Sequence, residues 1–365
     1  MSISAFEHPY LSGLVGDEET GAMFSASADI GAMLAFERAL ALAEGEAGVI
    51  PSAAAGLIAD LCGVLEPDVV ALRAAVARDG VVVPQLIKQL KAAAGDDAAQ
   101  YVHLGATSQD VIDTSLMLRL KGVLTIFASR LERLSEQFVQ LEKNFGARPM
   151  MAHSRMQAAL PITVADRLRS WSAPLERHRA RLQHQISALP IQFGGAAGNL
   201  DQLGPRASEV RRRLADHLGL ADQVQWQSQR DGVVELADTL SLISGSLGKF
   251  GQDIALLAQM GEEIRLAGGG GSSAMAHKQN PVAAEALVTL ARHNAVLVSG
   301  MHQSIVHEQE RSGAAWTLEW LLLPPMAMAT GASLRLASEL VVKIQSLGRT
   351  DGESVGPLDP LPVNP

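Results

Sequence analysis

The sequence is poor in the residues that cross-link small domains or bind soft metals. It contains one cysteine, Cys62, among 365 residues. A single thiol excludes an internal disulfide and a metal site built from several cysteines, and it fits a reducing cytosol, so we expect a cytoplasmic location. The N-terminal stretch MSISAFEHPY has no basic region followed by an apolar run, which argues against a secretory signal peptide.

Aromatic residues, long apolar runs and excess basic charge are also lacking. Aromatic residues make up 4% of the chain, whereas Ala and Leu dominate, and this composition favours helix over sheet. No uninterrupted run of about 18 apolar residues occurs, so we expect no membrane-spanning segment. Thirty Lys and Arg stand against 39 Asp and Glu, a formal net charge of −9, which argues against a nucleic-acid-binding protein. A hydrophobic fraction of 47% excludes a disordered chain.

Proline is absent between residues 84 and 149, 205 and 281, and 281 and 324, which leaves these stretches free to form unbroken helices. Apolar residues recur there every three or four positions, first over residues 112–141 and again over 233–257. This spacing puts a narrow apolar stripe along one side of each helix, as in helical bundles. A helix of about 32 residues is about 48 Å long and needs long partners, so we predict an elongated central bundle.

Further helices are predicted around residues 158–187, 281–304 and 326–345. Asn280-Pro281 predicts an N-cap followed by proline at the first helical position. Shorter helices, over 30–47 and 67–78, are broken by Gly and Pro.

The chain shows no internal repeat and no secure strand pattern, and its end is rich in proline without apolar periodicity. We therefore predict an all-α protein in three parts. These are a small helical N-terminal domain over residues 1–105, a long-helix bundle over 106–347 and a flexible C-terminal tail over 348–365.

A polar, hydroxyl-rich segment at residues 101–110, Tyr-Val-His-Leu-Gly-Ala-Thr-Ser-Gln-Asp, precedes the first long helix. Thr107 or Ser108 could simply cap that helix. Hydroxyls and free backbone N–H groups at a helix N-terminus also form a site for a carboxylate or phosphate. The two roles are compatible.

Four glycines at residues 268–271 are followed by Ser-Ser-Ala-Met-Ala-His-Lys-Gln-Asn-Pro at 272–281. We predict that the glycines end the preceding helix and form a mobile loop. A plain linker is the alternative, but a linker does not need paired serines with a His, a Lys and an Asn. A nucleotide P-loop matches poorly, because lysine does not directly follow the last glycine and no strand precedes it. The loop offers hydroxyls, N–H donors and one cation to a negatively charged substrate.

Two further polar segments are weaker signals. Residues 152–161 carry His153 and Arg155 between two predicted helices, and each alone is expected at the surface. Residues 307–313, His-Glu-Gln-Glu-Arg-Ser-Gly, lack a second histidine at zinc-protease spacing. A solvated charged turn is therefore the default interpretation there.

The glycine–serine loop and the segment before the first long helix together resemble the fumarase/aspartase superfamily, over about residues 5–345. The signature loop of that superfamily reads roughly GSSxMPxKxNP, and residues 271–281 match it except that Ala276 replaces the proline. Residues 107–110, followed by Asp and Thr at 113–114, resemble its first motif. The resemblance implies a long-helix bundle that acts on small carboxylates without a metal or other cofactor.

Two segments resemble the cycloisomerase branch of the superfamily, the 3-carboxy-cis,cis-muconate lactonizing enzymes. Residues 192–198 are similar to QFGGAxGT, and residues 308–320 to EHERxxGxWxxEW, with Gln309 in place of a histidine. The lyase branch carries GRTHxQxAxP, whose histidine position falls on Arg155 while Gln157 matches. A lyase that relays a proton through that histidine would be compromised. We also expect the C-terminal domain of the lyases to be truncated, because the chain ends soon after the last predicted helix.

The resemblance implies an intramolecular lyase that converts 3-carboxy-cis,cis-muconate to 4-carboxymuconolactone in the protocatechuate (β-ketoadipate) degradation of aromatic compounds. By superfamily position, Ser272 transfers the proton and Lys278 is the second catalytic residue. The implied substrate-binding residues are Thr107, Ser108, Gln109, Gln157, Ser273, Asn280 and Arg311.

Superfamily members are typically homotetramers whose active sites take loops from three chains, so a homotetramer is expected here. The expected partner is a small polycarboxylate, without nucleic acid or membrane. Two alternatives stay open: an adenylosuccinate or argininosuccinate lyase-like enzyme that eliminates fumarate, and a non-enzymatic helical scaffold.

Overall fold

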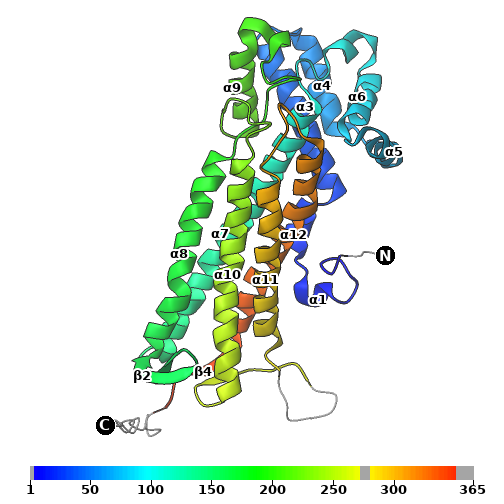
Figure 1. Ribbon diagram of the computed structural model, residues 1–365. Helices are drawn as coiled ribbons and strands as arrows, with labels where there is room; N and C mark the ends of the chain where they lie inside the picture. The colour runs from blue at the N-terminus through cyan, green and yellow to red at the C-terminus, as the bar shows by residue number, and fades with distance from the viewer. Residues whose placement is uncertain (1–3, 272–279, 351–365) are drawn as a thin grey trace.

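Five long helices run up and down beside one another and form an elongated bundle in the computed structural model, which describes residues 4–271 and 280–350 (Figure 1). They are α7 (Ser108–Phe145), α8 (Val164–Ala188), α10 (Asp231–Met260), α11 (Val282–Gln303) and α12 (Gly313–Val342). The predicted helical fold with a long central bundle is confirmed. Within the described residues, no helix is both long and apolar enough to cross a membrane.

The bundle helices meet along the apolar stripes that the sequence contains. Leu120, Phe127 and Leu134 of α7 are buried in one continuous core with Leu240 and Leu247 of α10. Side chains three and four residues apart lie on the same face of a helix, so the stripe faces inward along the whole length of each rod.

Shorter helices cover the end of the bundle at which α7 begins (Figure 1). They are α3 (Ala26–Glu46), α4 (Ser52–Val64), α5 (Val69–Asp79), α6 (Val83–Ala98) and α9 (Ala207–Leu218), while α1 (Ser12–Val15) and α2 (Glu18–Met23) lie along the bundle. Helices α3, α4, α5, α6 and α9 share a second hydrophobic core, which also takes Ile191, Phe193 and Leu203 from the connection between α8 and α9. The predicted domain boundary at residue 105 stays a prediction.

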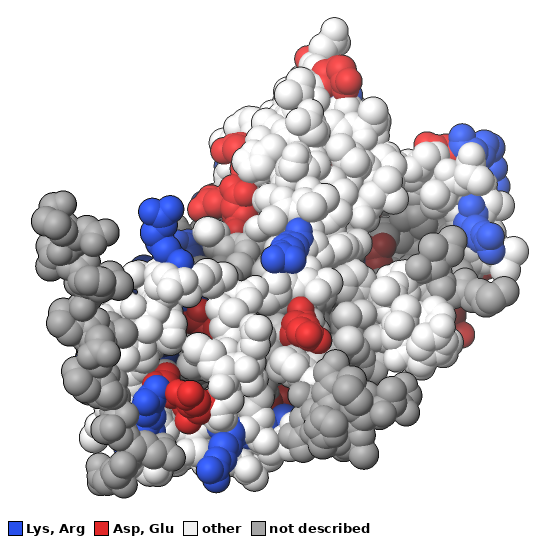
Figure 2. Space-filling view, turned by 60° about the horizontal axis from the view of Figure 1, so that its bottom comes forward, with Lys and Arg blue, Asp and Glu red and all other residues white. Residues whose placement is uncertain are grey.

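Two antiparallel sheets of two strands each lie at the opposite end of the bundle, and the first of them is a hairpin. Strand β1 (Pro149–Ser154) pairs with β2 (Gln157–Thr163), and β3 (Ile264–Leu266) pairs with β4 (Ile344–Leu347). In the view toward this end, charged side chains of both signs are scattered, with wide areas between them that carry neither sign (Figure 2).

The prediction that residues 158–163 begin a helix is wrong, since they form β2 and α8 begins at Val164. The hairpin turns through Arg155 and Met156, which both adopt positive φ angles, of 50° and 67°. Neither residue type signals a tight turn, so the local sequence conceals the hairpin.

Three predicted helix boundaries also differ from the structure. Helix α12 begins at residue 313 rather than 326 and continues through Pro324 and Pro325, because packing against α7, α10 and α11 outweighs the usual cost of a proline inside a helix. The glycine run does not end α10, which stops at Met260 with Gly261 in the left-handed conformation, φ 76°. The N-cap of α11 is Pro281 rather than Asn280.

The core of the shorter helices contains an unpaired carboxyl group. Glu44 of α3 is fully buried, and neither of its carboxyl oxygens has a hydrogen-bond partner. Burial, and to a lesser degree the charge of Glu37 on the same helix, raises the pKa of Glu44 from its ordinary 4.5 to about 9. Between these two values the unfolded chain ionises Glu44 while the folded chain keeps it protonated, so stability falls as the pH rises.

We predict that Glu44→Gln increases the free energy of unfolding by about 1 kcal/mol or more at about pH 8. At this pH the wild-type chain must take up a proton on Glu44 when it folds, whereas an amide is neutral in both states. The advantage should shrink as the pH falls toward 4.5, the ordinary pKa of this carboxyl. Urea unfolding of both proteins at about pH 8, 6 and 4.5 measures the difference. A difference that does not change with pH would contradict the explanation.

Candidate active site

The segment before α7 is anchored to its surroundings on several sides. Nδ1 of His103 lies 2.6 Å from Oε1 of Glu37 on α3. The N–H of Gly105 donates to Oε1 of Gln202 at 3.2 Å. Thr107 is the N-cap of α7, so the hydroxyl-rich sequence ends where the free N–H groups of a 38-residue helix begin.

Asp110 ties the start of α7 to the glycine-rich connection between α8 and α9. Its carboxylate accepts hydrogen bonds from Nε2 of Gln192 at 3.0 Å, from the N–H groups of Gly194 and Gly195 at 2.9 Å, and from the N–H of Thr107 at 3.0 Å. Burial raises the pKa of Asp110 to about 6, although these four donors favour the ionised form. All four partners are N–H donors, an arrangement that suits the ionised carboxylate.

The glycines of this connection are required by close packing. Gly195 has a φ of 67°, and a Cβ there would lie 2.8 Å from the carbonyl oxygen of Gly105. At Gly194, a Cβ would lie 2.7 Å from the side chain of Gln225. Because these positions lack side chains, the segment that resembles QFGGAxGT and the loop that contains Gly105 can pack together at the start of α7.

One turn further along α7, a buried ion cluster joins three parts of the chain. Arg230, just before α10, is fully buried, with Nη1 2.6 Å from Oδ2 of Asp113 on α7 and Nη2 2.5 Å from Oε2 of Glu319 on α12. Trp316 Nε1 donates to Oδ1 of Asp113 at 2.9 Å, and the guanidinium lies 4.8 Å from the ring centre of Trp226. Burial alone would lower the pKa of Arg230, but the two carboxylates outweigh it and raise the pKa.

Arg311 lies over the N-terminus of α7, on the loop between α11 and α12. Its Nε donates to Oε1 of Gln109 at 3.0 Å, and its Nη2 donates to Oγ1 of Thr107 at 3.2 Å. Arg311 is exposed, and Ser108 in the first turn of α7 is half-buried. A guanidinium, hydroxyl groups and a helix N-terminus therefore lie together at the surface, which suits an anion such as a carboxylate.

Other predicted site residues lie at the far end of the bundle. Gln157 opens β2 and is exposed, and Arg155 is exposed at the tip of the same hairpin. Asn280 is half-buried and pairs with Gly270 beside the start of α11. Helix α7 runs between the two ends for 38 residues, a length of about 57 Å (Figure 1).

The structure therefore divides the predicted site residues into separate groups. Thr107, Ser108, Gln109 and Arg311 lie together at one end, and Gln157 and Asn280 lie at the other. The predicted catalytic residues Ser272 and Lys278, and the predicted substrate-binding residue Ser273, lie outside the described residues.

The sequence interpretation missed the ion cluster. Arg230 is separated by 117 residues from Asp113 and by 89 from Glu319, so no local pattern relates them. The interpretation of residues 307–313 as a solvated turn is wrong for His307, whose side chain is buried with Nε2 3.7 Å from Oε1 of Glu319. The spacing of Trp316 and Glu319, on one face of a helix, is the one signal that could have indicated part of the cluster.

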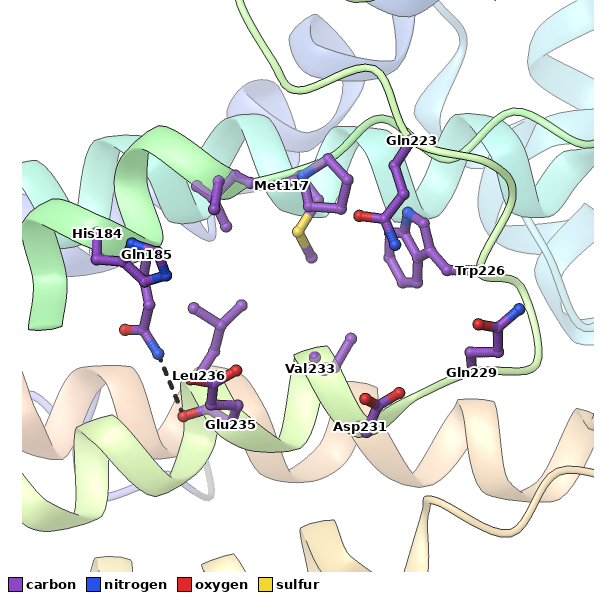
Figure 3. A pocket seen from close by; sticks show the side chains of 14 residues that line it. Met117, His184, Gln185, Gln223, Trp226, Gln229, Asp231, Val233, Glu235 and Leu236 are labelled. Carbon is purple, nitrogen blue, oxygen red and sulfur yellow. Dashed lines mark hydrogen bonds between the residues drawn. The ribbon is translucent and has the colours of Figure 1, made fainter.

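A cavity of about 250 Å³ opens beside Trp226, between the end of α8 and the start of α10 (Figure 3). The carboxylates of Asp231 and Glu235 line it together with the imidazole of His184 and with amide and apolar side chains. None of its lining residues in the described part of the chain is Lys or Arg, so it does not suit a polycarboxylate. Across residues 4–271 and 280–350, no group of three or more His, Cys, Asp and Glu is arranged to hold a metal ion.

The family model described as lyase matches residues 17–296. The chain belongs to this lyase family, and the predicted membership of the fumarase/aspartase superfamily is confirmed.

The chain is 41% identical to the 3-carboxy-cis,cis-muconate cycloisomerase of Pseudomonas aeruginosa, over 88% of this chain and 72% of that protein. It is 36% identical to the N-acetyl-S-(2-succino)cysteine lyase of Enterococcus italicus, over 90% of this chain and 73% of that protein. The crystal structure of the 3-carboxy-cis,cis-muconate lactonizing enzyme from Pseudomonas putida matches with a TM-score of 0.86 and 35% identity, over 92% of this chain and 77% of that one.

We predict that Asp113→Asn lowers the free energy of unfolding by about 3 kcal/mol, because Arg230 stays charged and buried but loses one of its two counter-ions. Urea unfolding measures the loss. The matched control is Glu339→Gln, which removes the exposed partner of Arg335 one turn away on α12 and should change stability by less than about 0.5 kcal/mol. Equal losses of unfolding free energy in the two variants would show that the buried cluster stabilises the protein no more than an exposed ion pair does.

Proposed function

We propose that this chain is a cycloisomerase that converts 3-carboxy-cis,cis-muconate into 4-carboxymuconolactone. Its similarity over most of its length to the cycloisomerases of Pseudomonas supports this activity. The structural observation that carries the proposal is that Arg311, Thr107 and the N-terminus of α7 lie together and suit an anion. The substrate carries three carboxylates, which such a site can bind. A cytoplasmic role in protocatechuate degradation belongs to the same proposal.

Negative charge develops on the substrate during the reaction, and a guanidinium with hydrogen-bond donors can stabilise it. A carboxylate of the substrate attacks a double bond conjugated to another carboxyl group, so that a C–O bond forms and the π electron pair moves into that carboxyl group. The resulting carbanion is then protonated on carbon. One proton is taken up overall, because the attacking carboxylate becomes an ester. Fixed donors at the position where the negative charge develops lower the barrier.

We assign the proton transfer to Ser272 and stabilisation of negative charge to Lys278, by their positions in the superfamily motif. A serine hydroxyl transfers a proton poorly unless positive charge and hydrogen-bond donors surround it, and Lys278 with the glycine N–H groups would supply them. Binding of substrate carboxylates is assigned to Thr107, Ser108, Gln157, Ser273, Asn280 and Arg311. Gln109 is fully buried and is assigned a different role below.

We further infer that the active site is assembled between chains of a homotetramer. About 57 Å of helix separates Thr107 and Arg311 from Gln157 and Asn280, so one chain cannot bring them all to one small molecule.

The outer faces of the bundle support this assembly. Leu242 of α10 is 51% exposed, Val296 of α11 is 72% exposed and Leu321 of α12 is 67% exposed. These side chains provide apolar surface on α10, α11 and α12 that other chains can bury.

We predict that the purified chain removes the diene absorbance of 3-carboxy-cis,cis-muconate and leaves the purine absorbance of adenylosuccinate unchanged. Ser272→Ala should lose about 100-fold or more in turnover with an unchanged helical circular dichroism spectrum. Lys278→Ala should raise KM and lower kcat together. Wild-type activity in Ser272→Ala would remove its assigned role, and turnover of adenylosuccinate in place of the muconate would replace the proposed function by the lyase alternative.

We predict a tetramer in light scattering at micromolar concentration, and activity in tetramers mixed from two inactive variants. If Arg311 and Ser272 of one site come from different chains, an equal mixture of Arg311→Ala and Ser272→Ala chains leaves about a quarter of the sites intact. Unfolding and refolding the two variants together, and then assaying muconate turnover, measures this fraction. A monomer, or a mixture as inactive as its parents, would contradict the shared site.

A further inference from the structure

The side-chain amide of Gln109 has no free hydrogen-bonding group for a substrate. Gln109 lies in the first turn of α7 and is 0% exposed. Its Nε2 donates to Oδ2 of Asp113 at 3.1 Å and to the carbonyl of Gln227 at 2.7 Å, while its Oε1 accepts from Nε of Arg311 at 3.0 Å. Two acceptors on one side and a donor on the other determine which way the amide points.

The groups beneath this amide are held by the buried ion cluster. Arg230 donates to both oxygens of Asp113, at 2.6 and 3.1 Å, and to both oxygens of Glu319, at 2.9 and 2.5 Å. Trp316 donates to Asp113 as well. Movement of Asp113 would leave a buried charge unpaired, so Asp113 provides a rigid support for Gln109.

The loop that carries Arg311 is attached to the same support. Gln227 is buried, and its Nε2 donates to the carbonyl of Glu310 at 3.1 Å. Because Nε of Arg311 donates to Gln109 and its Nη2 donates to Thr107, the orientation of the guanidinium plane is fixed. Its Nη1 has no hydrogen bond to any residue in the described part of the chain and lies on an exposed side chain, where a ligand can reach it.

We propose that Gln109 is a positioning residue, which does not touch the substrate but orients Arg311 to receive a substrate carboxylate. This inference rests on the proposed function, in which the substrate is a polycarboxylate, and it replaces the direct contact expected of Gln109 from the sequence. An arginine held in its binding orientation loses less side-chain entropy when a carboxylate binds. The contribution of Gln109 therefore falls on KM more than on kcat.

The test combines variants of the two residues. Gln109→Met keeps the length and burial of the side chain and removes its hydrogen bonds, and we expect KM for the muconate to rise about tenfold with kcat changed less than about threefold. Arg311→Ala should raise KM further. The double variant should match Arg311→Ala, because Gln109 has nothing left to orient.

Two more variants separate positioning from stability and from charge. Gln185 of α8 is also buried and donates to Oγ1 of Thr239 at 2.9 Å, so Gln185→Met removes a similar amide elsewhere in the bundle and should leave KM unchanged. Arg311→Lys, on an exposed side chain, keeps the charge but lacks Nε, so it should raise KM about tenfold as well.

Several results would overturn the inference. They are additive effects of Gln109→Met and Arg311→Ala, an equal rise of KM in Gln185→Met, and a nearly unchanged KM in Arg311→Lys.

Failure of the proposed function would be seen separately, as a wild-type chain that does not consume the muconate. The same set of variants would then be compared by calorimetric binding of propane-1,2,3-tricarboxylate, whose affinity should follow the same pattern. Wild-type protein that binds no tricarboxylate would overturn the inference too.

Discussion

Arg230 carries a full charge inside the protein, at the point where α7, α12 and the connection before α10 meet. Removing a guanidinium from water costs several kcal/mol unless opposite charges and hydrogen bonds replace the water. Asp113 and Glu319 provide both, from segments far apart in the chain. The cluster is satisfied only when these segments are correctly placed, so this end of the bundle is rigid where the candidate active site lies.

The rest of the site is built outward from this cluster. Asp113 holds Gln109, and Gln109 holds Arg311 beside Thr107 at the start of α7. Asp110 holds the same helix start against the glycines after α8. The buried cluster around Arg230 thus holds the exposed Arg311 in a defined orientation without burying it.

The two ends of the bundle divide the functional residues between them. A rod about 57 Å long cannot fold back on itself, so the hairpin that carries Gln157 stays remote from Thr107 within one chain. Under the proposed assembly, neighbouring rods that run in opposite directions place the far end of one chain beside the near end of another. The cycloisomerase and lyase relatives show that one fold accommodates different reactions, so the residues at such junctions, rather than the bundle itself, determine the chemistry.

The sequence by itself determined the long helices, because packing along a bundle needs only an apolar face that repeats every three or four residues, as over 112–141 and 233–257. It also indicated a helix cap at Thr107 or Ser108, since capping depends on neighbouring residues, and Thr107 takes that position. Only the tertiary structure decided that α12 continues through Pro324 and that Gln109 is buried beneath Arg311. Helix continuation there depends on packing against other rods, and the partners of Arg230 lie 117 and 89 residues away, where no local pattern can reveal them.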